Sequence, residues 1–270
     1  MIFKKKKKYE QLCVVLGVLL VSLSIVASEL VVNVKNKGGD VQVESIDADT
    51  AANTISMYFV KIDGTHIYQF IDFKSEIQIF RAVVLPEEEQ GQTQHQVMCF
   101  VMHYLKNEFI SSDAMSKLRQ KNSRAIRTPE DDKGREIHNH DLIIYLDQSH
   151  LISPYIYNIC RDANDKIFAQ DVDLRIISRS LGKDYNVMKS ATKQYIPSKY
   201  PRCRDISDSL KPCSCQFEIC VGWYPCGLKY CRGNDSLGHL VSYRCGIKTC
   251  RKCHIFKHYE MQKTNCMWDY

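Results

Sequence analysis

Residues 54–73 read TISMYFVKIDGTHIYQFIDF and decide the class of fold. Two runs rich in β-branched and aromatic residues, Thr54–Ile62 and Thr65–Phe73, flank the dipeptide Asp63-Gly64. An Asp-Gly pair between such runs is the strongest short hairpin signal, because both residues tolerate the left-handed backbone of a tight turn. These residues therefore predict two antiparallel strands of a sheet.

The strand pattern continues on both sides of this hairpin. Residues 30–35 and 41–43 alternate apolar and polar side chains, which is the period of a half-buried strand. Residues 75–85 and 96–105 extend the sheet, and the acidic segment 86–94 between them is a loop. The predicted fold class is α+β, with an antiparallel sheet and two or three helices.

Helices and a loop are predicted after residue 105. Residues 128–140 are charged and contain Pro129 and Gly134, so we expect an exposed loop. His138 and His140 would then be a surface cluster rather than a metal site. The remaining elements are a short helix capped by Ser112 with Met115 and Leu118 on one face, a strand at 141–146, a helix from Ser153-Pro154 to Ile167, and a helix at 171–181 ended by Gly182.

The N-terminus has the pattern of a secretory signal peptide. Five lysines, Lys4 to Lys8, precede an apolar run from Leu12 to Val26. The small residues Ala27 and Ser28 then offer a cleavage site. The apolar run is shorter than the roughly 20 residues of a spanning helix, so we expect cleavage, secretion and no membrane span afterwards.

Removal of this signal changes the charge of the chain. The full sequence carries a formal net charge of +6, and the mature chain retains about +2. This balance is not that of a nucleic-acid-binding protein. Cys13 also leaves with the signal, so an even number of cysteines remains, which fits complete pairing in an exported chain.

Cysteines crowd the last quarter of the chain and divide it near residue 200. We predict a β-rich domain at 29–180, a linker at 181–202 and a small cysteine-rich module at 203–270. The predicted disulfide cysteines are Cys99, Cys160, Cys203, Cys213, Cys215, Cys220, Cys226, Cys231, Cys245, Cys250, Cys253 and Cys266. The ten in the module allow 945 pairings by combinatorics, so the sequence does not decide among them.

A zinc site is the alternative interpretation of the cysteine-rich module. Cys213-x-Cys215, Cys250-x-x-Cys253, His254 and His258 are residue types that bind zinc. That chemistry needs thiolates, which an oxidising compartment removes. We therefore predict no metal and no cofactor. The aromatic residues of the module are either its small core or a contact surface: Trp223, Tyr224, Tyr230, Tyr243 and Trp268.

Residues 50–165 resemble the BRICHOS domain. The resemblance rests on Asp72-Phe73-Lys74, Cys99-Phe100-Val101 and Ile156–Cys160, with a polar loop between the last two. It implies that Asp72 is the family aspartate and that Cys99 pairs with Cys160. From the residues alone, both cysteines could also be buried free thiols.

The whole chain resembles the Out at first family of secreted developmental proteins. The motifs are Phe73-Lys74, Phe80-Arg81-Ala82, Ala114–Asn122, Pro201–Arg204, Lys211-Pro212-Cys213, Trp223–Cys226, Leu228–Cys231, Cys245-Gly246-Ile247, Cys266 and Trp268-Asp269. The resemblance implies an extracellular role in development, including the nervous system. Cys220 and Cys253 depart from the family pattern, and the simplest hypothesis pairs them with each other.

Two surface features point to extracellular chemistry. Asn234-Asp235-Ser236 is a glycosylation sequon between two glycines. A run of basic residues is either a solvated helix face or a contact for acidic glycans or an acidic protein patch. The basic residues are Lys117, Arg119, Lys121, Arg124 and Arg127.

No catalytic motif is present among the patterns that commonly carry hydrolase, phosphoryl-transfer or metalloprotease chemistry. We therefore predict a secreted, non-enzymatic protein that acts in development by recognising an extracellular or cell-surface protein. The alternative is a chaperone-like role, in which the BRICHOS-like sheet shields aggregation-prone segments of a client.

Overall fold

The computed structural model describes residues 29–119, 122, 124–196, 199–234 and 236–269. The predicted signal peptide lies outside these residues. The strands are β1 (Leu30–Lys35), β2 (Val41–Asp49), β3 (Thr54–Val60), β4 (His66–Asp72), β5 (Ile77–Val84), β6 (Gln96–His103), β7 (Ile126–Arg127), β8 (Asp131–Asn139), β9 (Leu142–Ile144), β10 (Ile167–Ala169), β11 (Thr192–Gln194), β12 (Cys213–Asn234) and β13 (Leu240–Glu260). The α-helices are α2 (Ser112–Ser116), α3 (Pro154–Cys160), α4 (Asp171–Leu181) and α5 (Tyr185–Ser190).

A large mixed sheet forms the body of the described residues, in the order β11-β9-β10-β6-β5-β4-β3-β2-β1-β7. The hairpin predicted from Asp63-Gly64 is confirmed, because β3 and β4 pair antiparallel and Gly64 has a φ of 79°. The strands from β1 to β6 run antiparallel in chain order. β7 pairs in parallel with β1, and β10 pairs in parallel with β6. The sheet is therefore mixed, whereas the sequence predicted an antiparallel one.

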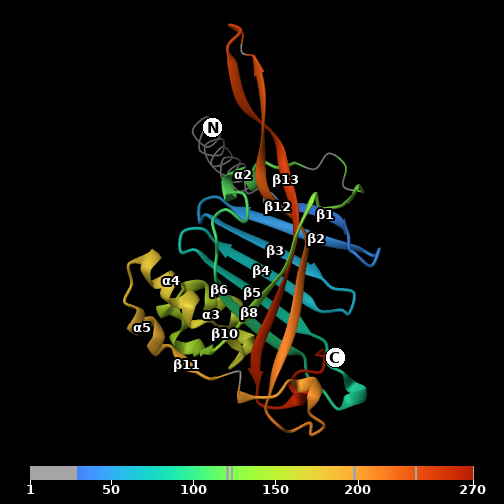
Figure 1. Ribbon diagram of the computed structural model, residues 1–270, viewed down its shortest axis with the longest axis vertical. Coiled ribbons are helices and arrows are strands. Elements are labelled where there is room, and N and C mark those ends of the chain that lie inside the picture. Colours follow the sequence, from blue (N-terminus) through green and yellow to red (C-terminus); the bar gives the residue numbers. More distant parts are fainter. Residues whose placement is uncertain (1–28, 120–121, 123, 197–198, 235, 270) are drawn as a thin grey trace, which may run out of the picture.

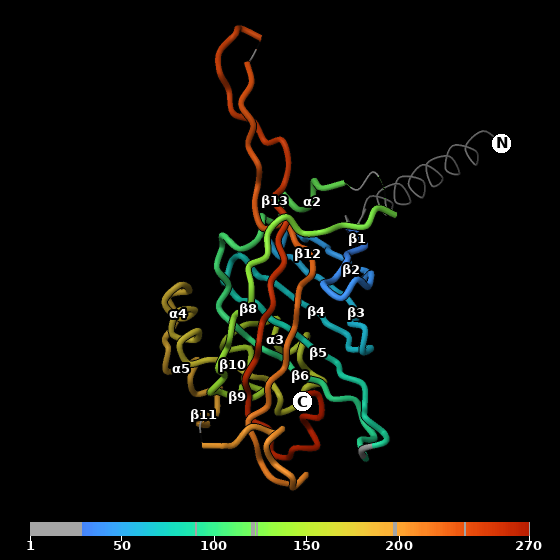
Figure 2. The backbone as a smooth tube through the Cα atoms, turned by 45° about the vertical axis from the view of Figure 1, so that its right-hand side comes forward, coloured from blue at the N-terminus to red at the C-terminus, as the bar shows by residue number. Residues whose placement is uncertain are grey.

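A second sheet, in the order β12-β13-β8, lies across one face of the large sheet (Figures 1 and 2). We call the covered face of the large sheet its inner face. Strand alternation directs Ile55, Met57 and Phe59 of β3 to this face, where one hydrophobic core also contains Phe217 and Ile219 of β12. The two sheets therefore share a core, and residues from both ends of the chain build it.

The helices cover part of the opposite, outer face of the large sheet. α3, α4 and α5 gather beside β10 and β11 in Figure 1. Ile156 of α3 and Leu174 of α4 pack there against Ile77 of β5. No helix of the described residues is long and apolar enough to cross a bilayer.

The prediction of a loop at 128–140 is wrong, although most of these residues are exposed as predicted. Residues 131–139 form β8, which pairs in parallel with β13 across more than a hundred residues of sequence. The charged side chains and Gly134, whose φ is 76°, break the alternation of apolar and polar residues by which a strand is recognised in a sequence. His138 and His140 are consequently buried rather than on the surface.

The helix predictions hold only in part. Four α-helices occur in the described residues, where the sequence predicted two or three. The cap of α2 is Ser111, whose Oγ accepts a hydrogen bond from the backbone N–H of Ala114, and not Ser112. The helix that begins at Pro154 ends at Cys160 rather than at Ile167, since Asn164 takes a positive φ of 51° and the chain then enters β10. The BRICHOS likeness stays a prediction.

The cysteine-rich region is more regular than its sequence suggests. β12 and β13 are 22 and 21 residues long and form one long hairpin. Its lower half packs on the large sheet, and its upper half projects beyond the body (Figure 1). Residues 181–202, predicted as a linker, include α5 and β11, and β11 pairs with β9 at the end of the large sheet.

Candidate functional site

A row of polar side chains, buried except for Glu136, lies between the two sheets. Alternation along β8 and β13 turns every second residue toward the inner face of the large sheet. The parallel register, which sets Glu136 beside His254 and His138 beside Phe256, then brings these side chains together. We call the set the polar ladder: Glu136, His138, His140, Lys252, His254, His258 and Glu260.

Aromatic rings from the large sheet enclose the middle of the polar ladder. The ring of Phe256 stacks on Phe100 at 4.1 Å between centroids. Phe80 lies 5.0 Å from the ring of His254, and Phe168 lies 4.6 Å from that of His258. The histidines therefore face rings and not water.

Ion pairs and one imidazole contact organise the upper end of the polar ladder. His138 Nε2 lies 3.0 Å from His254 Nδ1. Lys252 Nζ lies 2.6 Å from Glu108 Oε1 and 2.7 Å from Glu136 Oε2. Burial lowers the pKa of His138 and takes that of His254 well below its usual value. Burial also disfavours the charged form of Lys252, but its two carboxylate partners outweigh this effect and raise its pKa.

The lower end of the polar ladder is poorly hydrogen-bonded. The side-chain nitrogens of His140 and His258 have no hydrogen-bond partner among the described residues. Glu260 pairs with Lys166 at 3.2 Å, and its other oxygen lies 3.4 Å from His258 Nε2 without the alignment of a hydrogen bond. Burial takes the pKa of His140 well below its usual value. The neutral imidazole is thus the state that burial favours at His140.

Glu44 of β2 joins the large sheet to a bulge in β12. The register of the long hairpin shifts between Val221 and Tyr224, which leaves backbone N–H groups free of the strand pairing. Glu44 accepts hydrogen bonds from the N–H of Gly222 at 3.0 Å and of Trp223 at 3.3 Å. Burial raises the pKa of Glu44 to about 8, although these two donors oppose the shift.

Disulfides fasten the long hairpin along its length. Cys220–Cys253, Cys226–Cys250 and Cys231–Cys245 cross between β12 and β13. Cys203–Cys213 and Cys215–Cys266 close its base. Cys99–Cys160 ties β6 to α3. All these sulfurs are bonded to each other, so none of them is available as a zinc thiolate.

The projecting upper half of the hairpin, residues 227–248, forms what we call the arm. On one face, strand alternation places Tyr230, Arg232 and Arg244, and Leu240 lies on the same face nearer the tip. All four are exposed. The arm therefore presents aromatic, aliphatic and basic groups well away from the body of the molecule (Figure 2).

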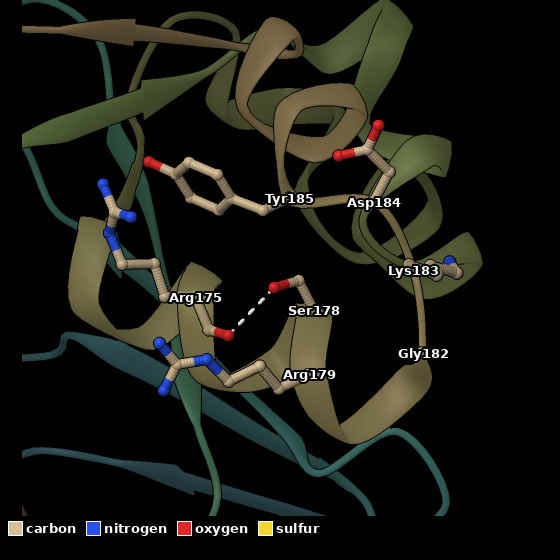
Figure 3. Close-up of a pocket in the computed structure, with 7 residues that line it drawn as sticks. All are labelled: Arg175, Ser178, Arg179, Gly182, Lys183, Asp184 and Tyr185. Carbon is tan, nitrogen blue, oxygen red and sulfur yellow. Dashed lines mark hydrogen bonds between the residues drawn. The ribbon is translucent and has the colours of Figure 1, made fainter.

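A hollow of about 380 Å³ lies at the junction of α4 and α5 (Figure 3). Arg175, Arg179 and Lys183 line it together with Tyr185. Arg175 is already paired with Asp171 at 2.7 Å and stacks over the ring of Tyr185. The charge of Arg175 is therefore already engaged within the fold.

Comparison with known proteins places the chain in a family. The family model described as "Out at first" matches residues 28–177, and the model described as "Out at first, C-terminal" matches residues 202–270. The chain belongs to the Out at first family. The Out at first protein of Drosophila virilis is 45% identical over 260 residues, which are 93% of this chain and 85% of that protein.

A second Out at first protein, from Drosophila melanogaster, is 46% identical over 252 residues. These cover 90% of this chain but 52% of that relative, so the chain spans about half of its length. No solved structure matches this Out at first chain.

The site residues predicted from sequence are scattered over this Out at first structure. Asp72 ends β4 and accepts hydrogen bonds from the N–H of Lys74 and the hydroxyl of Ser75, so it closes a turn. Cys99 pairs with Cys160, as the BRICHOS resemblance implied, and Cys220 pairs with Cys253, as the simplest hypothesis proposed.

The basic residues do not share a helix face. α2 ends at Ser116, before the run begins. Lys117 pairs with Asp113 at 2.7 Å, Arg127 lies in β7, and Lys121 lies outside the described residues. Asn234 is exposed near the end of the arm.

The aromatic residues of the C-terminal region divide between core and surface. Trp223 and Tyr224 are buried and belong to the core shared by the two sheets, and Trp268 packs partly buried against it. Tyr230 and Tyr243 are exposed on the arm. The polar ladder was missed altogether. Its signal is period-two spacing, His138-x-His140 and His254-x-Phe256-x-His258-x-Glu260, in strands far apart in sequence.

Proposed function

We propose that this protein is a secreted, non-enzymatic factor that acts in development by binding an extracellular or cell-surface protein through the arm. Three lines support the proposal: the family, the extensive disulfide pairing that suits an oxidising compartment, and the shape of the arm. The shape of the arm is the main support. Only the base of the arm, at Leu228 and Ile247, packs against the shared core. A projecting two-stranded ribbon is marginal in water, so its retention with a disulfide favours a role in binding.

The chemistry of the arm suggests the kind of partner. Tyrosine and arginine contribute most strongly to protein interfaces, because they combine apolar area with directed hydrogen bonds. Tyr230, Arg232 and Arg244 share one exposed face, which fits an acidic protein patch with an apolar centre. Acidic glycans share only the charge of such a patch, and they remain a second class of partner.

Cell-surface binding of the full-length secreted protein tests this proposal. The double variant Tyr230→Ser with Arg244→Ser should lose most binding to cells of developing tissue and should keep its thermal unfolding midpoint. Ile62→Ser, which removes an exposed apolar side chain from the body, is the control and should bind normally. Equal binding by the arm variant and the native chain would refute the assignment to the arm.

The outer face of the large sheet supports a second function, a chaperone-like one. Val31, Val43, Tyr58 and Val60 of β1–β3 are exposed there, away from the helices. An uncovered apolar strip on a sheet can shield an aggregation-prone strand. The BRICHOS resemblance adds to this proposal. Tyr58→Lys in the full-length chain should weaken suppression of client aggregation, and an unchanged suppression would count against it.

A further inference from the structure

Three potential metal ligands meet at the upper end of the polar ladder. The side chains of Glu136, His138 and His254 each offer one ligand atom, and these atoms all lie within 4.8 Å of one another. His138 Nε2 is 3.0 Å from His254 Nδ1 and 3.9 Å from Glu136 Oε2. These contacts join β8 to β13, whose sequences are more than a hundred residues apart.

The surroundings hold the two imidazoles in place. Both are more than nine-tenths buried, and the rings of Phe80 and Phe256 pack against them. Fixed ligand orientation lowers the entropy lost on binding an ion. Glu136 is about half exposed at 49%, so it can adjust toward an ion between the two nitrogens.

The donor set and its spacing suit zinc. Two histidines and one glutamate are a known zinc set that leaves one coordination position for water. Zinc–nitrogen bonds of about 2.0–2.1 Å at a tetrahedral angle separate two ligand nitrogens by about 3.3 Å. The observed 3.0 Å needs only a small displacement of the rings.

A small cavity adjoins His254 between the two sheets. It has a volume of about 20 Å³, enough for one water molecule, and His254, Gln69 and Tyr104 line it. Gln69 Oε1 is buried and has no hydrogen-bond partner among the described residues. A water molecule in this cavity would give the Gln69 oxygen a partner beside the imidazole of His254.

Lys252 competes with an ion for Glu136, and Glu108 limits this competition. The ammonium group of Lys252 lies 2.7 Å from Glu136 and 2.6 Å from Glu108. When Glu136 turns to an ion, Lys252 keeps Glu108 as a partner, so no unpaired charge is left. A wider hollow of about 470 Å³, lined by Glu108, Glu136 and Lys252, gives access from solvent.

We propose that Glu136, His138 and His254 bind one Zn²⁺ ion that fastens β8 to β13. The ion would strengthen the pairing of β8 with β13 within the second sheet, which carries the arm. This role differs from the zinc interpretation of the cysteine-rich module, because no cysteine takes part. It is also independent of partner binding by the arm.

Zinc binding to the full-length, disulfide-intact protein tests the site. After dialysis against a chelator, calorimetric titration with ZnCl₂ should show one ion per chain and a higher unfolding midpoint with zinc. His138→Gln and His254→Gln should each weaken binding more than about tenfold. Glu136→Gln should also weaken it, and this half-exposed position keeps the test valid if a histidine variant does not fold.

Two further variants separate this site from its neighbours. His140→Leu removes another buried histidine of the polar ladder at similar volume and should bind zinc as the native chain does. Lys252→Met removes the competing cation and should bind zinc more tightly. Absence of stoichiometric binding, or normal binding by both His138→Gln and His254→Gln, would overturn the proposal. So would loss of binding in His140→Leu.

Discussion

Replacing Glu44 with glutamine tests how the large sheet holds the long hairpin. The pKa of the Glu44 carboxyl is raised by burial from its ordinary 4.5 to about 8. Each pH unit between these values corresponds to about 1.4 kcal/mol, so the whole interval corresponds to about 5 kcal/mol. A raised folded-state pKa means that the contribution of Glu44 to stability is full below 4.5 and is lost as the pH rises through 8.

Glutamine does not titrate and cannot reproduce this dependence. It also replaces one acceptor oxygen by a donor opposite the backbone N–H of Gly222 or Trp223, so Glu44→Gln should cost about 1–3 kcal/mol at low pH.

Urea unfolding of both proteins, with disulfides intact, at several pH values from about 5 to about 8 provides the measurement. The stability advantage of the native chain should shrink by about 3–4 kcal/mol over this range. A constant difference between the two proteins would refute the reasoning.

Three other perturbations have defined outcomes. Burial lowers the pKa values of His138, His140 and His254, so their contribution to stability is present above about pH 6.5 and is lost as the pH falls. In thermal unfolding, the midpoint of His140→Leu should therefore fall less steeply with decreasing pH than that of the native chain. Replacing Cys99 and Cys160 with alanine removes a disulfide between positions 61 residues apart in sequence. Chemical unfolding should show that the free energy of unfolding falls by about 4 kcal/mol. A Cβ at Gly222 would lie 2.9 Å from a Glu44 oxygen, so Gly222→Ala should cost about 1–3 kcal/mol in the same assay. Gly227→Ala, where the nearest atom would lie at 3.7 Å, is its control and should cost less.

Local patterns were sufficient for the first part of the fold. The Asp63-Gly64 turn and the alternation of residues 30–35 act between neighbours in sequence, and the strands form where they were expected. β8 was missed because its partner is β13, and a parallel pairing across such a distance leaves no local signal. Its charged residues also suggested solvent, although Glu136 among them belongs to the polar ladder.

The candidate sites were harder to foresee for the same reason. His138 and His254 come within contact distance only because β8 and β13 lie side by side, and the sequence did not predict that pairing. In the cysteine-rich region, Cys213 and Cys215 occupy the alternate buried positions that Phe217 and Ile219 continue, so the period of the strand was not recognised. The exposed Tyr230 and Tyr243 could not be told from core residues, since both uses favour aromatic side chains in a strand.

The shared core also sets an order of events during synthesis. The inner face of the large sheet consists of residues made early, among them Phe59, Phe80 and Phe100, and its cover consists of residues 213–260. Until that segment has emerged, the nascent chain exposes a broad apolar surface, which invites aggregation or chaperone binding. A chain interrupted before residue 213 should therefore be retained and degraded rather than released as a smaller folded protein.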